Sequence, residues 1–154
     1  MVACVAAAAK CLADLACRLK KSFHPFAKSC ISICLEKFKE KKLVTALREC
    51  IDACMLSYSL DNILGDLTVA LQNQNPQIRT ETASFLSRQF AAHTFAILTN
   101  LLEHLLDPLV ERLSDTDASV RDASAKAIGT PMKVSYFPFS FLLSLVTHRS
   151  WVRS

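Results

Sequence analysis

The sequence Asn75-Pro76-Gln77-Ile78-Arg79 has a counterpart further along the chain, Asp117-Ala118-Ser119-Val120-Arg121. Each copy opens with a polar residue that can cap a helix, continues to a branched apolar residue and ends in arginine. Equivalent positions of the two copies are 42 residues apart. An amphipathic segment precedes each copy and an alanine-containing segment follows it, which predicts a helix, a tight polar turn and a second helix.

The spacing predicts a stacked all-helical architecture. A period of about 40 to 47 residues, built from two helices and a polar turn, is typical of HEAT repeats. The 154 residues contain only two glycines, so β-hairpins and phosphate-binding loops are disfavoured. We therefore expect an all-α HEAT-repeat solenoid in residues 1–133, with about three helical hairpins and one preceding helix. The turns of such an array line one edge, which is the natural contact surface.

Hydrophobic spacing places the helices at about 2–19, 26–40, 43–57, 62–72, 76–90, from 95 onward and 119–133. In the second helix we expect a buried stripe of Phe26, Cys30, Ile33, Cys34 and Phe38. Asp107-Pro108 predicts either a kink or a restart of its helix, and Gly129-Thr130-Pro131 a weakened last turn.

The seven cysteines all lie within the first 54 residues of the chain, at apolar positions of the expected helices. Two pairs, Cys30/Cys34 and Cys50/Cys54, are spaced i, i+4 and differ from the CxxC spacing that zinc prefers. We expect buried free thiols in a reducing compartment.

Positive charge is concentrated in one region of the chain, whose overall net charge is +4. Nine Lys or Arg face two acidic residues between Arg18 and Arg48. This excess favours an acidic partner, which could be a protein, a nucleic acid or a membrane, but a solvated helix face has the same composition.

Catalytic motifs are lacking. The four histidines form no HExxH pair, and no Walker loop or nucleophile elbow occurs. Glu103 and Asp107 could work as an acid/base pair, although simple surface charges are the commoner reading of such spacing. We expect neither an enzyme nor a cofactor or metal site.

Two apolar stretches raise the question of a membrane. Residues 2–19 contain Lys10 and Asp14, whose burial in a bilayer would be costly. The apolar core of the aromatic stretch 134–154 is too short to cross a bilayer, and the stretch has no place in the repeat register, so we treat it as a separate hydrophobic tail. No membrane partner is expected.

Four blocks of the sequence resemble a TOG domain of the ch-TOG and Minispindles family of microtubule polymerases, and the second TOG domain of that array is the nearest match. The blocks are AAKCLADLACRLKKSF, LEKFKEKK, NQNPQIRTETASFLSRQF and SDTDASVRDASAKAIGTPMKV. They occur in the family's order and cover residues 1–133.

The resemblance implies that intra-repeat turns grip a curved αβ-tubulin dimer, without enzymatic activity. Carried onto this chain, the tubulin-binding residues are Lys39, Lys41, Lys42, Asn75, Arg79, Asp117 and Arg121. The lysines and arginines would face acidic tubulin, while Asn75 and Asp117 shape their turns. Each arginine also has a purely structural interpretation, namely a local ion pair of Arg79 with the nearby Glu81 and of Arg121 with the adjacent Asp122.

The resemblance also implies a place in the cytoplasm, on microtubules, spindle poles and kinetochores. Against the family's six repeats, the first two and the start of the third are missing. The alternative is a general HEAT scaffold that binds an acidic peptide or protein along its inner helices. Nucleic-acid binding is not expected, because aromatic residues are not interleaved with the basic turn.

Overall fold

The structure, a computed structural model, describes residues 1–134 together with Ser140 and Ser144. Its α-helices are α1 (Val2–Leu19), α2 (His24–Lys37), α3 (Val44–Cys54), α4 (Leu64–Leu71), α5 (Pro76–Ala92), α6 (Phe95–Arg112) and α7 (Ala118–Val134). Short 3-10 helices cover Lys20–Phe23, Lys41–Leu43 and Leu60–Ile63. The described part of the chain contains no strand.

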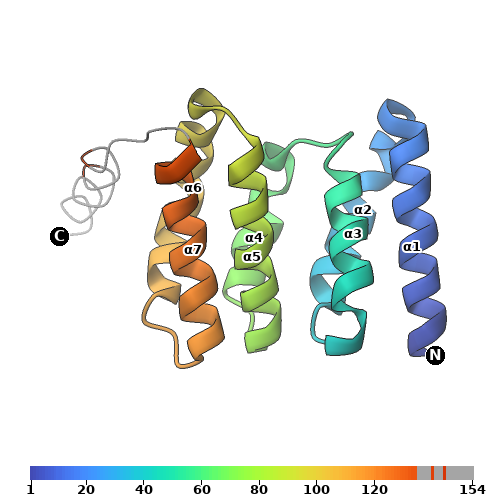
Figure 1. Ribbon diagram of the computed structural model, residues 1–154, viewed down its shortest axis with the longest axis horizontal. Coiled ribbons are helices and arrows are strands. Elements are labelled where there is room, and N and C mark those ends of the chain that lie inside the picture. Colours follow the sequence, from blue (N-terminus) through green and yellow to red (C-terminus); the bar gives the residue numbers. More distant parts are fainter. Residues whose placement is uncertain (135–139, 141–143, 145–154) are drawn as a thin grey trace.

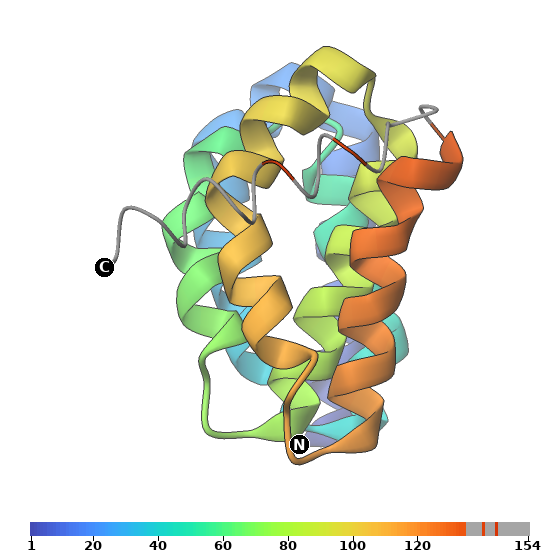
Figure 2. The ribbon, with the colours of Figure 1, turned by 90° about the vertical axis from the view of Figure 1, so that its left-hand side faces the viewer.

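The helices form two layers, which Figures 1 and 2 show from two directions. Helices α2, α4 and α6 make the outer layer, and α1, α3, α5 and α7 make the inner layer. The hairpins α2–α3, α4–α5 and α6–α7 stack side by side, and α1 packs against α3 at one end. The predicted all-α array of three hairpins and a preceding helix is confirmed.

The core lies between the two layers and runs continuously along the array. Helix α5 is at its centre and contacts both α4 and α7. Its large apolar residues Ile78, Phe85, Leu86 and Phe90 are all buried. Burying each side chain of this size contributes roughly 1.5–3 kcal/mol, so α5 is a main source of the array's cohesion.

The predicted buried stripe of α2 was partly wrong. Phe26 and Ile33 are 61% and 57% exposed, whereas Ala27, Ile31 and Leu35 are buried. Apolar residues occur on more than one face of this helix, so periodicity alone could not choose between the faces. Packing against α3 and α5 makes the choice.

The prolines inside two helices do not interrupt them. Helix α6 continues through Pro108, so the predicted restart is wrong, and α7 continues through Pro131 to Val134. A proline inside a helix removes one backbone hydrogen bond. Around Pro108, the buried Leu105, Leu106 and Leu109 hold the segment against the core.

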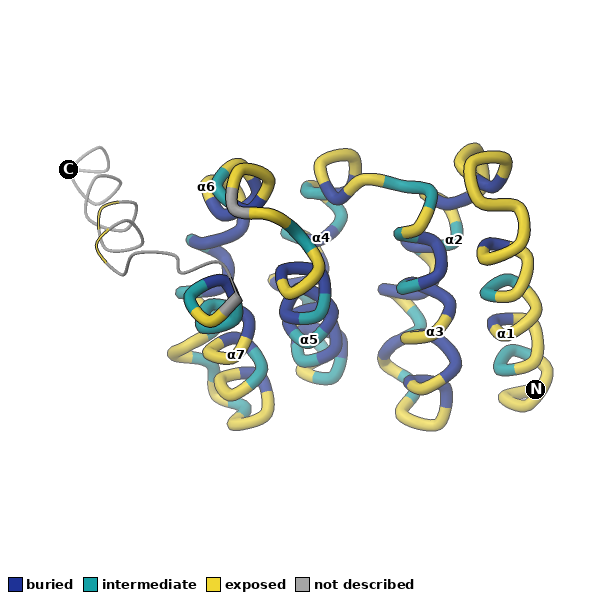
Figure 3. The backbone as a smooth tube through the Cα atoms, turned by 45° about the horizontal axis from the view of Figure 1, so that its top comes forward, coloured by how far each residue is buried: buried dark blue, intermediate teal, exposed yellow. Residues whose placement is uncertain are grey.

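The cysteines divide by helix. Cys34, Cys50 and Cys54 are buried and Cys30 is half-buried, as expected for core thiols. Cys4, Cys11 and Cys17 on α1 are exposed, which corrects the prediction for that helix. The physical reason is that α1 has a neighbouring helix on one side only, so much of its surface stays uncovered (Figure 3).

Ion pairs connect the α2–α3 hairpin to the α4–α5 hairpin on the inner layer. Arg48 donates to both carboxylate oxygens of Glu81, at 2.7 and 2.9 Å. Arg88 donates to both oxygens of Asp52, at 2.9 and 3.1 Å. Each pair joins α3 to α5 with a bidentate geometry that suits arginine.

Among the described residues, none of the helices is both long and apolar enough to span a membrane. The predicted hydrophobic tail, 134–154, lies almost entirely outside the described residues.

Candidate functional site

Three connections reach the same edge of the array, at the bottom of Figure 1, and we call this edge the turn rim. It consists of residues 38–43 between α2 and α3, 72–75 between α4 and α5, and 113–117 between α6 and α7. The edge was predicted as the contact surface, and its turns carry or adjoin all of the predicted site residues.

The α4–α5 turn is shaped by its own side chains. Asn73 Oδ1 accepts the backbone N–H of Asn75 at 2.9 Å, and Asn75 Oδ1 accepts that of Gln77 at 2.9 Å. Asn75 is thus the N-cap of α5, followed by Pro76 at the first helical position. Arg79 Nη1 closes the turn by donating to the carbonyls of Asn73 and Gln74, at 2.8 and 3.0 Å.

The α6–α7 turn repeats these bonds 42 residues later. Asp115 Oδ1 accepts the N–H of Asp117 at 3.0 Å, and Asp117 Oδ1 accepts that of Ser119 at 2.8 Å. Arg121 Nη1 donates to the carbonyls of Asp115 and Thr116, at 2.8 and 3.2 Å. The sequence echo therefore corresponds to one turn geometry built twice.

The two turns are joined by a buried ion pair. Arg79 Nη2 donates to Asp115 Oδ1 at 2.8 Å, with 10% and 4% of the two side chains exposed. The guanidinium of Arg79, together with the backbone N–H of Asp117, lowers the pKa of the Asp115 carboxyl. Asp115 therefore stays ionised and holds both turns in register.

The α2–α3 turn is built differently and presents lysines. Phe38 and Leu43 are fully buried and anchor its two ends. Lys39, Lys41 and Lys42, which lie between them, are exposed. Across the described residues, no carboxylate forms an ion pair with any of these three lysines. Their charges are available to a partner.

Residues from all three turns line one depression of about 380 Å³. Its lining residues are Lys39, Lys41, Asn75, Pro76, Gln77, Thr80, Asp117 and Ser119. Four of the predicted site residues are thereby brought together. Cations lie at the α2–α3 end and a carboxylate lies at the α6–α7 end, so the depression has a graded charge.

The other predicted residues lie close by but in different environments. Lys42 is exposed on the α2–α3 turn without lining the depression, and Arg121 is exposed at the α6–α7 turn. Arg79 is only 8% exposed, and its guanidinium is committed to the rim itself. Arg79 does not form the expected local ion pair with Glu81. Glu81 binds Arg48 instead, and Arg79 binds Asp115.

Four lining residues were not predicted as site residues: Pro76, Gln77, Thr80 and Ser119. Gln77, Thr80 and Ser119 are polar residues near the start of α5 or α7. Polar side chains in the first two turns of a helix that follows a rim turn are the signal that could have found them. In the described part of the chain, no group of three or more His, Cys, Asp or Glu residues could hold a metal ion.

Residues 3–135 match the family described as stalled ribosome sensor GCN1-like, HEAT repeats. The chain is 45% identical over 136 residues to Protein mini spindles of Drosophila melanogaster, covering 86% of this chain and 7% of that protein. It is 37% identical over 131 residues to Zygote defective protein 9 of Caenorhabditis elegans, covering 83% and 9%. The chain thus spans less than a tenth of either relative.

A solved structure concerned with microtubule plus end tracking by XMAP215, CLIP-170 and EB1 has the same fold. It aligns with a TM-score of 0.86 and 42% identity, over 94% of this chain and 61% of the other. The resemblance to a TOG domain is thus confirmed, while the assignment to the second TOG domain stays a prediction. The chain matches the GCN1-like HEAT-repeat family and belongs to the TOG domains of the ch-TOG and Minispindles type.

Proposed function

We propose that this chain is a non-enzymatic tubulin-binding module of a protein that promotes microtubule growth. The partner is αβ-tubulin, bound through the turn rim. The observation that carries the proposal is the single depression to which all three turns contribute, with unpaired lysines at one end. The name of Protein mini spindles and the subject of the matching solved structure, microtubule plus end tracking, support this choice of partner.

The contact residues are Lys39, Lys41 and Lys42 on the first turn, Asn75 on the second, and Asp117 and Arg121 on the third. The lysines face acidic groups of tubulin, and this complementarity mainly sets the rate and orientation of encounter. Arg79 acts as a positioning residue, because its guanidinium holds the second turn to the third. The module works in the cytoplasm, on microtubules and at spindle poles, without a nucleic-acid or membrane partner.

Co-elution with unpolymerised tubulin in gel filtration tests the proposal. Lys39→Glu combined with Lys41→Glu reverses two charges in the depression and is expected to abolish co-elution. Lys20→Glu combined with Lys21→Glu makes the same change in exposed residues of the α1–α2 connection, outside the depression, and is the matched control. Equal co-elution of both double variants would show that the rim is not the binding surface.

A second candidate function, binding of an acidic peptide along the inner helices, has one observation in its favour. Arg48, Arg88 and Lys126, with Ser84 and Ser87, line a depression of about 250 Å³ on the inner layer. Both arginines already hold carboxylates, of Glu81 and Asp52, which leaves Lys126 as the main attraction for an anion. This candidate would be favoured if Lys126→Glu lost co-elution with tubulin while the double variant Lys39→Glu/Lys41→Glu still co-eluted.

A further inference from the structure

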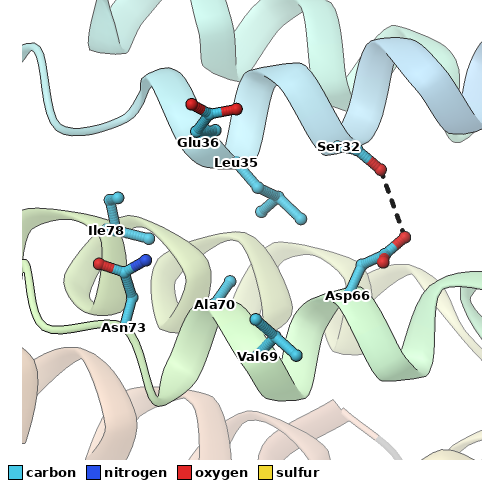
Figure 4. A pocket seen from close by; sticks show the side chains of 8 residues that line it. All are labelled: Ser32, Leu35, Glu36, Asp66, Val69, Ala70, Asn73 and Ile78. Atoms are coloured by element: carbon cyan, nitrogen blue, oxygen red, sulfur yellow. Dashed lines mark hydrogen bonds between the residues drawn. The ribbon is translucent and has the colours of Figure 1, made fainter.

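A groove on the outer layer is separate from the depression on the turn rim. It lies between α2 and α4 and has a volume of about 230 Å³, roughly the space of seven or eight waters. Its lining residues are Ser32, Leu35, Glu36, Asp66, Val69, Ala70, Asn73 and Ile78 (Figure 4). None of the proposed tubulin-contact residues lines this groove.

The groove has an apolar floor and an exposed apolar border. Leu35, Ala70 and Ile78 are only 4%, 6% and 4% exposed and belong to the core. Val69, in contrast, lines the groove and is 68% exposed. An exposed branched apolar residue in a groove loses unfavourable contact with water when a partner covers it.

The charge of the groove is negative. Glu36 comes from α2 and Asp66 from α4, and no cationic residue is among the lining residues. Asp66 accepts one long hydrogen bond, from Ser32 Oγ at 3.3 Å, which leaves most of its carboxylate free to accept further donors (Figure 4). The two carboxylates repel phosphates and acidic peptides and attract a cationic side chain.

We propose that this groove docks a short basic and apolar peptide segment of a partner protein. An arginine or lysine of the segment pairs with Asp66 and Glu36, and a neighbouring aliphatic side chain covers Val69 and the floor formed by Leu35 and Ala70. Charge complementarity selects this occupant. A basic segment is attracted here and repelled by the lysines of the turn rim, so the two surfaces recognise ligands of opposite charge.

Binding of a labelled peptide to the full 154-residue chain tests the proposal. The probe is fluorescein-labelled SLARLLARLS with capped ends, and SLAELLAELS is its acidic counterpart. We expect fluorescence anisotropy to report binding of the basic peptide only. In NMR spectra, the shifted backbone amides are expected in residues 32–36 and 66–71, rather than on the turn rim.

Matched variants locate the site. Glu36→Gln combined with Asp66→Asn is expected to lower the affinity for the basic peptide about five-fold, since partly exposed charge pairs are individually weak. Ser32→Arg places a cation inside the groove and is expected to lower this affinity as well. Glu103→Gln removes an exposed carboxylate from α6 and is expected to leave binding unchanged.

Three results would each overturn the proposal. The first is an affinity for the acidic peptide equal to that for the basic peptide. The second is equal binding of the basic peptide by the double variant Glu36→Gln/Asp66→Asn and by Glu103→Gln. The third is a set of amide shifts confined to residues 39–42. Circular dichroism of each variant shows whether the variant is folded, so that a lower affinity for the peptide can be assigned to the change in the groove.

Discussion

Arg79 and Asp115 lie 36 residues apart in the sequence, yet their side chains meet at 2.8 Å and are almost fully buried. Arg79 belongs to α5 and Asp115 to the α6–α7 turn, so the pair connects neighbouring hairpins. The equivalent of Arg79 in the next turn, Arg121, makes the same bonds to its own turn carbonyls but is exposed. The repeat therefore provides a natural comparison between one arginine in two environments.

Replacing Arg79 by alanine is expected to destabilise the chain by about 3 kcal/mol, because it leaves the buried carboxylate of Asp115 short of its main partner. Arg121→Ala removes the corresponding hydrogen bonds from an exposed residue and is expected to cost about 1 kcal/mol. Urea denaturation followed by circular dichroism measures both. Equal losses would contradict the distinction between the buried and the exposed arginine.

Acidification is expected to weaken the rim through Asp115. Its pKa is lower in the folded chain than in the unfolded chain, mainly because of Arg79. The ionised carboxyl therefore contributes its full stabilisation above the ordinary pKa of aspartate, about 4, and loses it as the pH falls further. Thermal melting as a function of pH should show a shallower decline below pH of about 4 in Asp115→Asn than in the parent. A parallel decline in both chains would count against this linkage.

The two ion pairs between α3 and α5 are expected to differ in strength. Only 4% of the Glu81 side chain is exposed, whereas the side chains of Arg88 and Asp52 are 35% and 37% exposed. Arg48→Ala leaves a buried carboxylate with Gln77 as its remaining partner and is expected to cost about 2 kcal/mol. Arg88→Ala disrupts a partly exposed pair and is expected to cost less than about 1 kcal/mol. Chemical denaturation of the two variants in parallel ranks them, and the reverse order would refute the argument from burial.

Thiol labelling is expected to separate the cysteines by helix. Cys4, Cys11 and Cys17 are exposed and should react with Ellman's reagent in the folded chain. Hydrogen bonding with Cys50 and burial raise the pKa of the Cys34 and Cys54 thiols, so these stay protonated as well as covered. They should react only after unfolding in denaturant. Mass spectrometry of peptides from the labelled native chain identifies the modified thiols, and rapid labelling of Cys34 or Cys54 would be inconsistent with the packing of α2 on α3.

The fold could be predicted largely from one repeated turn motif. The two copies of the turn motif define the period, and the capping residues Asn75 and Asp117 adopt the role that their residue types favour. Local hydrogen bonds of this kind depend on spacing within a few residues, which a sequence displays directly. The buried face of α2 could not be predicted in the same way, because Phe26 and Ile33 compete with Ile31 and Leu35 on a helix that is apolar on several sides.

The place of the candidate site in the fold could be predicted, whereas the contacts made by its individual residues could be predicted less well. Polar turns at a constant interval had to gather on one edge, and Lys39, Lys41, Asn75 and Asp117 do line one depression. The commitment of Arg79 to Asp115 was missed because it depends on how one hairpin lies against the next. Pairings between hairpins are set by packing across the array and leave no local signal.

The repeated turn also sets the spacing between two positions on the turn rim. Because equivalent internal hydrogen bonds shape each turn, and a buried ion pair joins one turn to the other, Asn75 and Asp117 are held at a defined spacing. A ligand whose own binding groups repeat at that interval can engage both bends at once. A ligand with a different repeat is expected to leave one turn unmatched, so that binding to both turns would depend on spacing as well as on charge.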